Sequence, residues 1–209
     1  MKEQTDNKLY DQLATDDQIE RAVQALQAHN IQTIVVETGA QARDAVLSLI
    51  PEGAEVHTAS SRTLEQIGLI AAIEESGCYQ AIHPLVRKID RVKQGREFRK
   101  LASSPEYMLG SVHAVTETGQ VVVGSGGGSQ IGPYAFGASK VIWVVGAQKL
   151  VPTLEDGMRR LQEYVYPLEN ERMQALVSRP AHLNQTLIVN GSLQPGRLTL
   201  VIVKEKLGF

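Results

Sequence analysis

Short apolar runs alternate with helical segments through the first half of the chain, and this alternation constrains the fold most. The runs IQTIVVE (31–37) and AEVHTAS (54–60) have the length and composition of strands. Between them, QARDAVLSLI (41–50) has helical spacing and stops before Pro51 and Gly53. Strands that are joined by helices pair in parallel, because each helix returns the chain to the same end of the sheet. We therefore expect an α/β fold with a largely parallel sheet that is covered by helices.

Two helices are expected to begin with a capping box, in which a Thr and a Gln three residues later bond each other's backbone amides. Thr15 and Gln18 have this spacing, and an apolar stripe follows them. Thr63 and Gln66 have it at the start of LEQIGLIAAIEE (64–75). Each pair predicts the first turn of a helix.

The second half of the chain predicts further strands. SVHAVTE (111–117) and QVVVGS (120–125) flank Thr118-Gly119 and form an expected β-hairpin. KVIWVVG (140–146) is continuously apolar, which is typical of a central strand. A helix with an apolar face follows and is expected to kink or end at Pro167. The last two strands are expected in TLIVN and RLTLVIVKE.

The charge of the chain is balanced, with 21 Lys and Arg against 23 Asp and Glu and a net charge of −2. Such a chain has no field that favours nucleic acid or an anionic lipid surface, so we expect neither partner. A basic segment, 84–103, keeps an apolar stripe at helical spacing, which favours a solvated helix face over an anion site: Leu85, Ile89 and Val92. No run approaches the roughly 18 apolar residues of a membrane helix.

Cys78 is the only cysteine of the chain. A single thiol excludes an internal disulfide and any cluster site that needs several thiolates from this chain. His57 and His113 have no second histidine three or four residues away, so we expect no metal site and read both as packed imidazoles. We expect a cytoplasmic protein with a polar N-terminal lead-in at 1–14 and a single α/β domain at 15–209.

The segment GSGGGSQ follows an apolar run and precedes an expected helix. Glycines let a backbone approach a ligand closely, and free amides near a helix start favour an anion. The pattern is neither a Walker A loop nor a dinucleotide fingerprint. It forms either a tight corner or an anion cradle, and the cluster favours the cradle, with these candidate ligand-binding residues: Gly124, Ser125, Gly126, Gly127, Gly128, Ser129 and Gln130.

Two segments together resemble the LUD domain family, which includes lactate utilisation protein C and other LutC/YkgG-like proteins. One is the stretch 116–173, which begins TETGQVVVGSGGGSQIGPYAFG, continues through VIWVVGAQKLVPTLEDGM and ends LENERM, and the other is PEGAEVHTASSRTLEQIG (51–68); the similarity covers roughly residues 15 to 205. The resemblance implies a three-layer α/β/α fold like that of the NagB/RpiA/CoA transferase-like proteins. It also implies a role in oxidation of L-lactate to pyruvate beside iron–sulfur oxidoreductase partners.

The resemblance also suggests site residues. Glu117 occupies a place comparable to the nucleophilic glutamate of coenzyme A transferases, although it is equally readable as a hairpin-turn residue. Ser60 and Ser61 lie between a strand and a helix, where they either bind an anion or cap the helix. Lys149 lies just after the central strand and is either a ligand contact or a surface lysine.

Three functions stay open at this point. The chain is a subunit or accessory factor of lactate oxidation that binds a small anionic ligand at the glycine loop. Alternatively, it is a stand-alone enzyme of the acyl/CoA transferase or ligase type that uses Glu117, or a ligand sensor without chemistry. A nucleotide or CoA-like ligand and a homo-oligomeric state are compatible with each of them.

Overall fold

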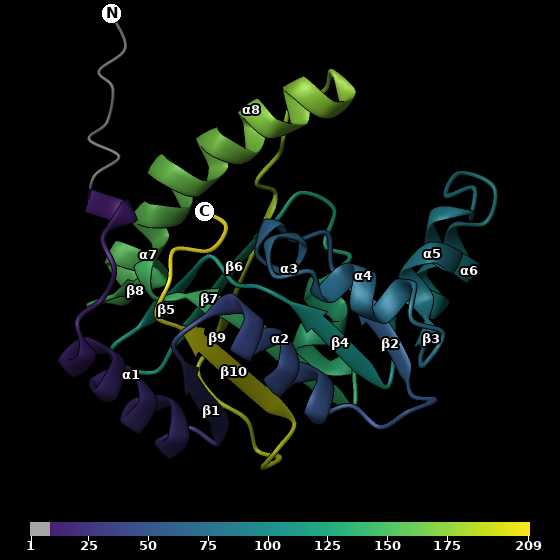
Figure 1. Cartoon of the computed structure of the whole chain (residues 1–209). Helices are drawn as coiled ribbons and strands as arrows, with labels where there is room; N and C mark the ends of the chain where they lie inside the picture. The colour runs from purple at the N-terminus through teal and green to yellow at the C-terminus, as the bar shows by residue number, and fades with distance from the viewer. Residues whose placement is uncertain (1–8) are drawn as a thin grey trace, which may run out of the picture.

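The computed structural model describes residues 9–209 and has a six-stranded sheet at its centre (Figure 1). Every pair of neighbouring strands in this sheet is parallel, which confirms the expected fold class. Strand β7 lies between β10 and β4, so the most apolar run is central. The strands, in order across the sheet, are β1 (Ile31–Val36), β10 (Leu198–Val203), β7 (Lys140–Gly146), β4 (Tyr107–Gly110), β2 (Glu55–Thr58) and β3 (Gln80–Ala81).

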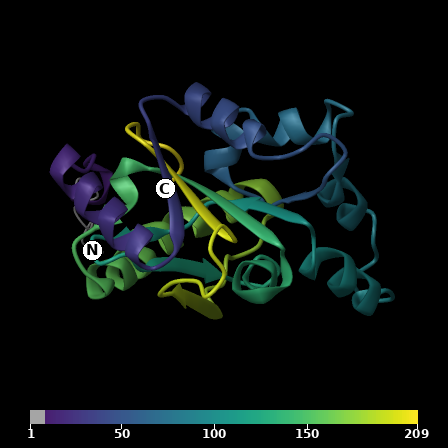
Figure 2. The ribbon, with the colours of Figure 1, turned by 90° about the horizontal axis from the view of Figure 1, so that it is seen from below.

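Three helices cover one face of the sheet, as Figure 2 shows: α2 (Gly39–Ser48), α3 (Arg62–Gln66) and α4 (Leu69–Glu74). Side chains alternate between the faces of a strand, so β7 serves two cores. Ile142 and Val144 pack with the residues of these helices, whereas Val141, Trp143 and Val145 face the opposite side. Both faces of the central strand are therefore buried.

The opposite face is covered by α1 (Asp16–Ala28) and by a second sheet. This sheet has the order β8 (Leu150–Val151), β5 (Ala114–Thr116), β6 (Val121–Ser125), β9 (Gln185–Val189). Strands β5 and β6 form the expected hairpin, and Gly119 has a φ of 82° in its turn. A further helical layer covers the outer face of this sheet: α7 (Leu154–Arg160), a π-helical turn (Leu161–Val165) and α8 (Tyr166–Val177).

Two features of the helix expected at 63–75 are wrong: its cap and its continuity. The cap of α3 is Ser61, whose Oγ accepts a hydrogen bond from the amide of Leu64, while Thr63 is buried inside the helix. The helix also stops at Gly68, which has a φ of 71° and separates α3 from α4. Pro167 does not end the later helix, which continues through α8, but the π-helical turn Leu161–Val165 interrupts the regular α-helix directly before it, and such turns are sites where helices bend.

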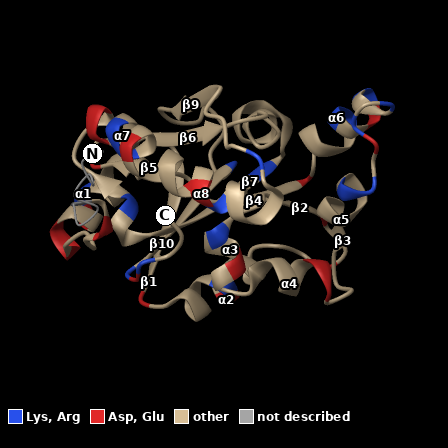
Figure 3. Ribbon diagram, turned by 90° about the horizontal axis from the view of Figure 1, so that it is seen from above, with Lys and Arg blue, Asp and Glu red and all other residues tan. Residues whose placement is uncertain are grey.

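The basic segment 84–103 does not form one helix. It contains parts of α5 (Ile82–Arg87) and α6 (Gly95–Ser103), and the side chain of Val92 is 95% exposed in the loop between them. Helices α5 and α6 pack around Ile82, Val86 and Ala102 instead of the expected stripe of Leu85, Ile89 and Val92. Figure 3 shows this basic end of the molecule far from α1 and α7.

Part of the expected N-terminal lead-in, residues 1–8, lies outside the described residues. The start of the described chain is held on the body by two residues: Tyr10 is buried, and Asp11 forms an ion pair with Lys206 and accepts a hydrogen bond from Tyr164. Over residues 9–209, we find no helix that is both long enough and apolar enough to cross a membrane.

Candidate functional site

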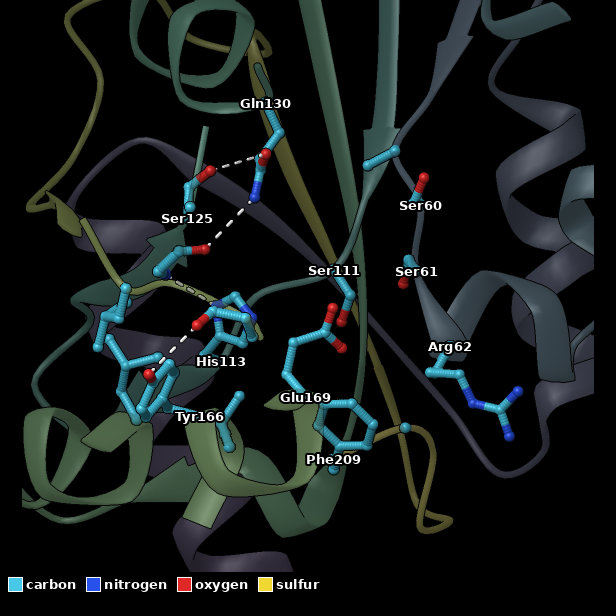
Figure 4. Close-up of a pocket in the computed structure, with 18 of the residues that line it drawn as sticks. Ser60, Ser61, Arg62, Ser111, His113, Ser125, Gln130, Tyr166, Glu169 and Phe209 are labelled. Atoms are coloured by element: carbon cyan, nitrogen blue, oxygen red, sulfur yellow. Dashed lines mark hydrogen bonds between the residues drawn. The ribbon is translucent and has the colours of Figure 1, made fainter. Parts of the chain in front are cut away.

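A cavity of about 410 Å³ opens where the carboxyl ends of β2, β4 and β7 face the second sheet (Figure 4). Ser60 and Ser61 follow β2, Ser111 follows β4, and Lys149 follows β7 through a short 3₁₀ turn. Parallel strands present their carboxyl ends at one edge, where ligands of α/β proteins bind. The glycine loop that follows β6 forms another wall of the same cavity.

Lys149 is a buried residue of this cavity, with an exposed fraction of 2%. Its Nζ donates hydrogen bonds to Thr63 Oγ1 (3.2 Å) and Ser111 Oγ (3.1 Å). No carboxylate within residues 9–209 forms an ion pair with it. Burial, and secondly the charge of Arg160, hold the pKa of Lys149 well below its usual value. This lysine is therefore not a surface residue but an amine without a counter-charge.

His113 also lines the cavity, although no pattern in the sequence separates it from an ordinary packed histidine. Its Nδ1 accepts a hydrogen bond from the amide of Gly124 (2.9 Å), so the neutral ring carries its proton on Nε2. Burial, followed by the charges of Lys149 and Arg160, lowers the pKa of His113 to about 3. The ring is consequently a neutral N–H donor at physiological pH.

The glycine loop divides into two parts. Gly124, Gly126 and Gly127 line the cavity, and the amides of Gly126 and Gly127 have no hydrogen-bond partner in the part of the chain that the structure describes. Gly128 has a φ of 76° and lies outside the cavity, where a Cβ atom would come within 2.2 Å of Gln185 Oε1. Two glycines thus present free amides, and Gly128 serves the turn.

Ser125 and Gln130 line the cavity but use their polar atoms to hold the loop. Ser125 Oγ donates to Gln130 Oε1 (3.1 Å) and accepts from the amide of Gly128 (2.9 Å), and Gln130 Nε2 donates to the carbonyl of Gly124 (3.3 Å). Figure 4 shows the first and last of these bonds. Ser129 does not reach this cavity and lines a smaller neighbouring one of about 110 Å³.

The two serines after β2 differ in their surroundings. Ser61 Oγ caps α3, as described above, whereas the hydroxyl of the exposed Ser60 has no hydrogen-bond partner within residues 9–209. In Figure 4 both lie across the cavity from Ser125. Ser60 is therefore the serine of this pair whose hydroxyl is free for a ligand.

Glu117 is not brought to the cavity. Its carboxylate accepts hydrogen bonds from Arg21 Nε (2.6 Å) and Gln18 Nε2 (3.1 Å), and the Arg21 bond is the main reason why its pKa is lowered. Glu117 and His113 lie at opposite ends of β5, about 13 Å apart for a strand that rises roughly 3.3 Å per residue. The nucleophilic role suggested for Glu117 has no support in this position, and the hairpin-turn reading accounts for it.

Later helices contribute a wall of the cavity that was not predicted from the sequence. Leu161, Val165 and Tyr166 come from the π-helical turn and the start of α8, and Leu183 comes from the segment before β9. These residues belong to no local motif, because only the packing of α7 and α8 on the second sheet brings them to the loop.

The smaller cavity contains two histidines. His83 Nδ1 lies 2.9 Å from Glu74 Oε1, and burial lowers the pKa of His57 to about 4. Within residues 9–209, no group of three or more His, Cys, Asp or Glu side chains is arranged to hold a metal ion. Cys78 is exposed.

Comparisons with known proteins relate this geometry to a family. The family model of the LUD domain matches residues 19–203. The crystal structure of a DUF162 family protein from Deinococcus radiodurans is similar, with a TM-score of 0.57 and 13% sequence identity over 92% of this chain and 99% of that one. At this identity the likeness shows the fold alone. The comparison with curated proteins gives no significant match.

Proposed function

The chain belongs to the LUD domain family, and from this premise we propose that it is a subunit or accessory factor of L-lactate oxidation to pyruvate in the cytoplasm. In this role it works beside iron–sulfur oxidoreductase partners that carry the electrons. A division of labour fits the sequence, because one cysteine cannot ligate a cluster that needs several thiolates. The contribution of this chain is then to bind a small anionic ligand, either as a monomer or as a homo-oligomer.

Lys149 is the observation that carries the ligand proposal. Within residues 9–209 this buried amine has two hydroxyls but no carboxylate at ion-pair distance, so it lacks the partner that a buried cation normally has. An anion in the cavity provides that partner and favours the charged form of the amine. The expected ligand therefore carries a carboxylate or a phosphate.

The neighbouring groups suit the same kind of ligand. The Nε2–H of His113 and the amides of Gly126 and Gly127 are all donors, and Ser60 adds a hydroxyl. Rigid donors around an oxyanion bind it without reorganising. Lactate, pyruvate, nucleotides and coenzyme A all carry such an anion, so each is a candidate.

Thermal stability tests the proposal directly. We expect lactate, pyruvate, a nucleotide or coenzyme A to raise the melting temperature of the purified chain, because a ligand that binds only the folded state stabilises it. Lys149→Met should abolish the rise. The matched control is Lys93→Met, since Lys93 has a side chain that is 83% exposed on the loop before α6. An equal rise in both variants would remove Lys149 from the site.

Growth tests the metabolic role. Deletion of the gene should prevent growth on L-lactate, and re-expression of the Lys149→Met variant should fail to restore it. The same deletion should have no effect where the neighbouring iron–sulfur genes are already absent. Unchanged growth on L-lactate after deletion would contradict the proposed role but not the anion site.

A further inference from the structure

The cavity has two unlike halves. On one side lie the donors around Lys149, and on the other lies a mainly apolar surface. The two halves meet at Gly124, where an added Cβ atom would be 2.7 Å from a methyl carbon of Leu161 and from one of Leu183. A ligand that contacts the donors therefore lies beside apolar side chains as well.

The apolar half, which we call the apolar wall, consists of Leu161, Val165, Tyr166, Met173, Leu183 and Phe209. Leu161 and Val165 are buried, with exposed fractions of 1% and 2%. The Tyr166 ring is held in place because its hydroxyl donates to the carbonyl of Ala181 (3.2 Å). Figure 4 shows Tyr166 and Phe209 on the side of the cavity away from Ser125 and Gln130.

Besides Lys149, the charged residues that line this cavity, Arg62, Glu169 and Arg172, form ion pairs. Glu169 lies between the two halves, but Arg172 binds its carboxylate with two hydrogen bonds of 2.7 Å. Arg62 forms an ion pair with Glu65 at 3.2 Å. Neither carboxylate forms an ion pair with Lys149.

The size of the cavity favours a ligand that is larger than lactate or pyruvate. Its volume of about 410 Å³ lies in the range of roughly 300 to 1,000 Å³ that is typical of pockets for drug-sized ligands. Lactate and pyruvate have only a few non-hydrogen atoms, so either acid leaves the apolar wall in contact with water. Burying apolar surface is favourable, and a larger ligand gains that contribution.

We propose that the ligand of this cavity is an organic anion with an apolar body, in which the anionic group meets Lys149 and the glycine amides and the apolar body packs on the apolar wall. This inference rests on the anion site proposed above and extends it. The apolar wall then determines which organic anions bind. The glycine loop alone does not provide this specificity.

Matched pairs of acids test the inference by titration calorimetry: pyruvate with phenylpyruvate, and lactate with 3-phenyllactate. Within each pair the anionic group is the same, so the ring is the only addition. We expect the phenyl acids to bind at least tenfold more tightly than their parents, because the ring is buried. 3-Phenyllactamide, which has no charge, should bind at least tenfold more weakly than 3-phenyllactate.

Two variants locate the ring. Leu183→Asn and Met173→Gln should each reduce the advantage of phenylpyruvate over pyruvate at least threefold. Met173→Gln keeps the length of the side chain, so it serves if Leu183→Asn fails to fold. Leu176→Asn is the control, since Leu176 lies on α8 outside the cavity and is 67% exposed.

The outcomes separate the two proposals. Equal affinity for pyruvate and phenylpyruvate, with both dependent on Lys149, would overturn the inference and leave the anion site standing. A tenfold advantage that survives in both variants would place the ring elsewhere and also overturn it. Absence of any binding that depends on Lys149 would overturn the anion site itself.

Discussion

The amide of Gly124 donates a hydrogen bond of 2.9 Å to Nδ1 of His113, and this bond joins the two strands of the hairpin at the cavity. A backbone amide can only donate, so it fixes the tautomer of the neutral ring. The remaining ring proton is on Nε2, and the ring acts as a donor there. The glycine loop therefore orients a side chain as well as presenting amides.

We predict that His113 stays neutral down to about pH 3 in the folded protein. Because its pKa is about 6.5 when unfolded, the unfolded chain binds one more proton between these values. The free energy of unfolding should therefore fall as the pH is lowered from 6.5, by at most about 1.4 kcal/mol per pH unit from this residue. Denaturation at pH 7, 6 and 5 measures the slope of the free energy of unfolding against pH. His113→Asn should remove from this slope the contribution of up to one bound proton.

Imidazole NMR provides an independent measurement of the same prediction. The ¹⁵N spectrum of His113 should show a protonated Nε2 and an unprotonated Nδ1 at pH 7, without titration between pH 8 and 5. A mid-point near pH 6.5 would contradict both the fixed tautomer and the buried environment.

We predict that Lys149→Met raises the free energy of unfolding of the ligand-free protein by about 1 to 2 kcal/mol. Within residues 9–209 the buried amine has no ion pair to lose, and burying a charged group without a partner costs free energy that an apolar side chain of similar size does not. Urea denaturation measures the change, and Lys93→Met should stay within about 0.5 kcal/mol of the natural protein. A destabilised Lys149→Met protein would mean that the two hydroxyl contacts outweigh the burial of the amine.

The parallel sheet was predictable because each of its longer strands has a recognisable local sequence pattern. After the exposed Lys140, KVIWVVG is buried on both faces, and strands in the middle of a parallel sheet are nearly continuous apolar runs. The end of α3 was not predictable from its apolar pattern, which continues through LEQIGLIAAIEE. Gly68 stops the helix by adopting a left-handed backbone, and Thr63 turns toward Lys149, a contact between residues 86 positions apart.

The candidate site was predictable only in part, because some of its residues are brought together by contacts that are distant in the sequence. Ser60, Lys149 and the glycines adjoin strand ends, so the sheet topology brings them together. Glu117 adjoins a strand end too, but this end lies beside α1, where Arg21 and Gln18 bind it. Which end of the hairpin faces the cavity depends on how the second sheet packs, and no local pattern records that.

We predict that Gly127→Val abolishes ligand-dependent stabilisation and leaves the fold intact. A Cβ atom on Gly127 meets nothing within 4 Å and its backbone is not left-handed, so the fold accepts a side chain there, while the added bulk at the cavity lining hinders a ligand at the Gly127 amide. Gly126→Val should also lower stability, since a Cβ atom there comes within 2.8 Å of the carbonyl of His182. Melting curves with and without ligand distinguish them, and unfolding of Gly127→Val would support a purely structural loop.

We predict that Gly110→Ala destabilises the protein by about 3 kcal/mol, because buried over-packing costs that order of energy. The added Cβ atom would lie 1.6 Å from Tyr134 Oη, and Tyr134 is itself buried against Trp143. Tyr134→Phe should recover part of the loss by removing the colliding oxygen. Urea denaturation of both single variants and the double variant measures the coupling, and additive losses would contradict a direct collision.

We predict that Glu117→Gln leaves ligand binding unchanged and lowers the free energy of unfolding by up to about 1 kcal/mol. The ion pair with Arg21 is partly exposed, with side-chain exposures of 54% for Arg21 and 15% for Glu117, and such pairs contribute little because water screens them. Arg21→Gln should change the stability in the same direction, and the double variant should be no less stable than either single one. Calorimetric titration checks the affinity and urea denaturation the stability. A tenfold loss of affinity in Glu117→Gln, with the affinity of Arg21→Gln unchanged, would show that Glu117 contacts the ligand. That result would contradict the placement of Glu117 and His113 at opposite ends of strand β5.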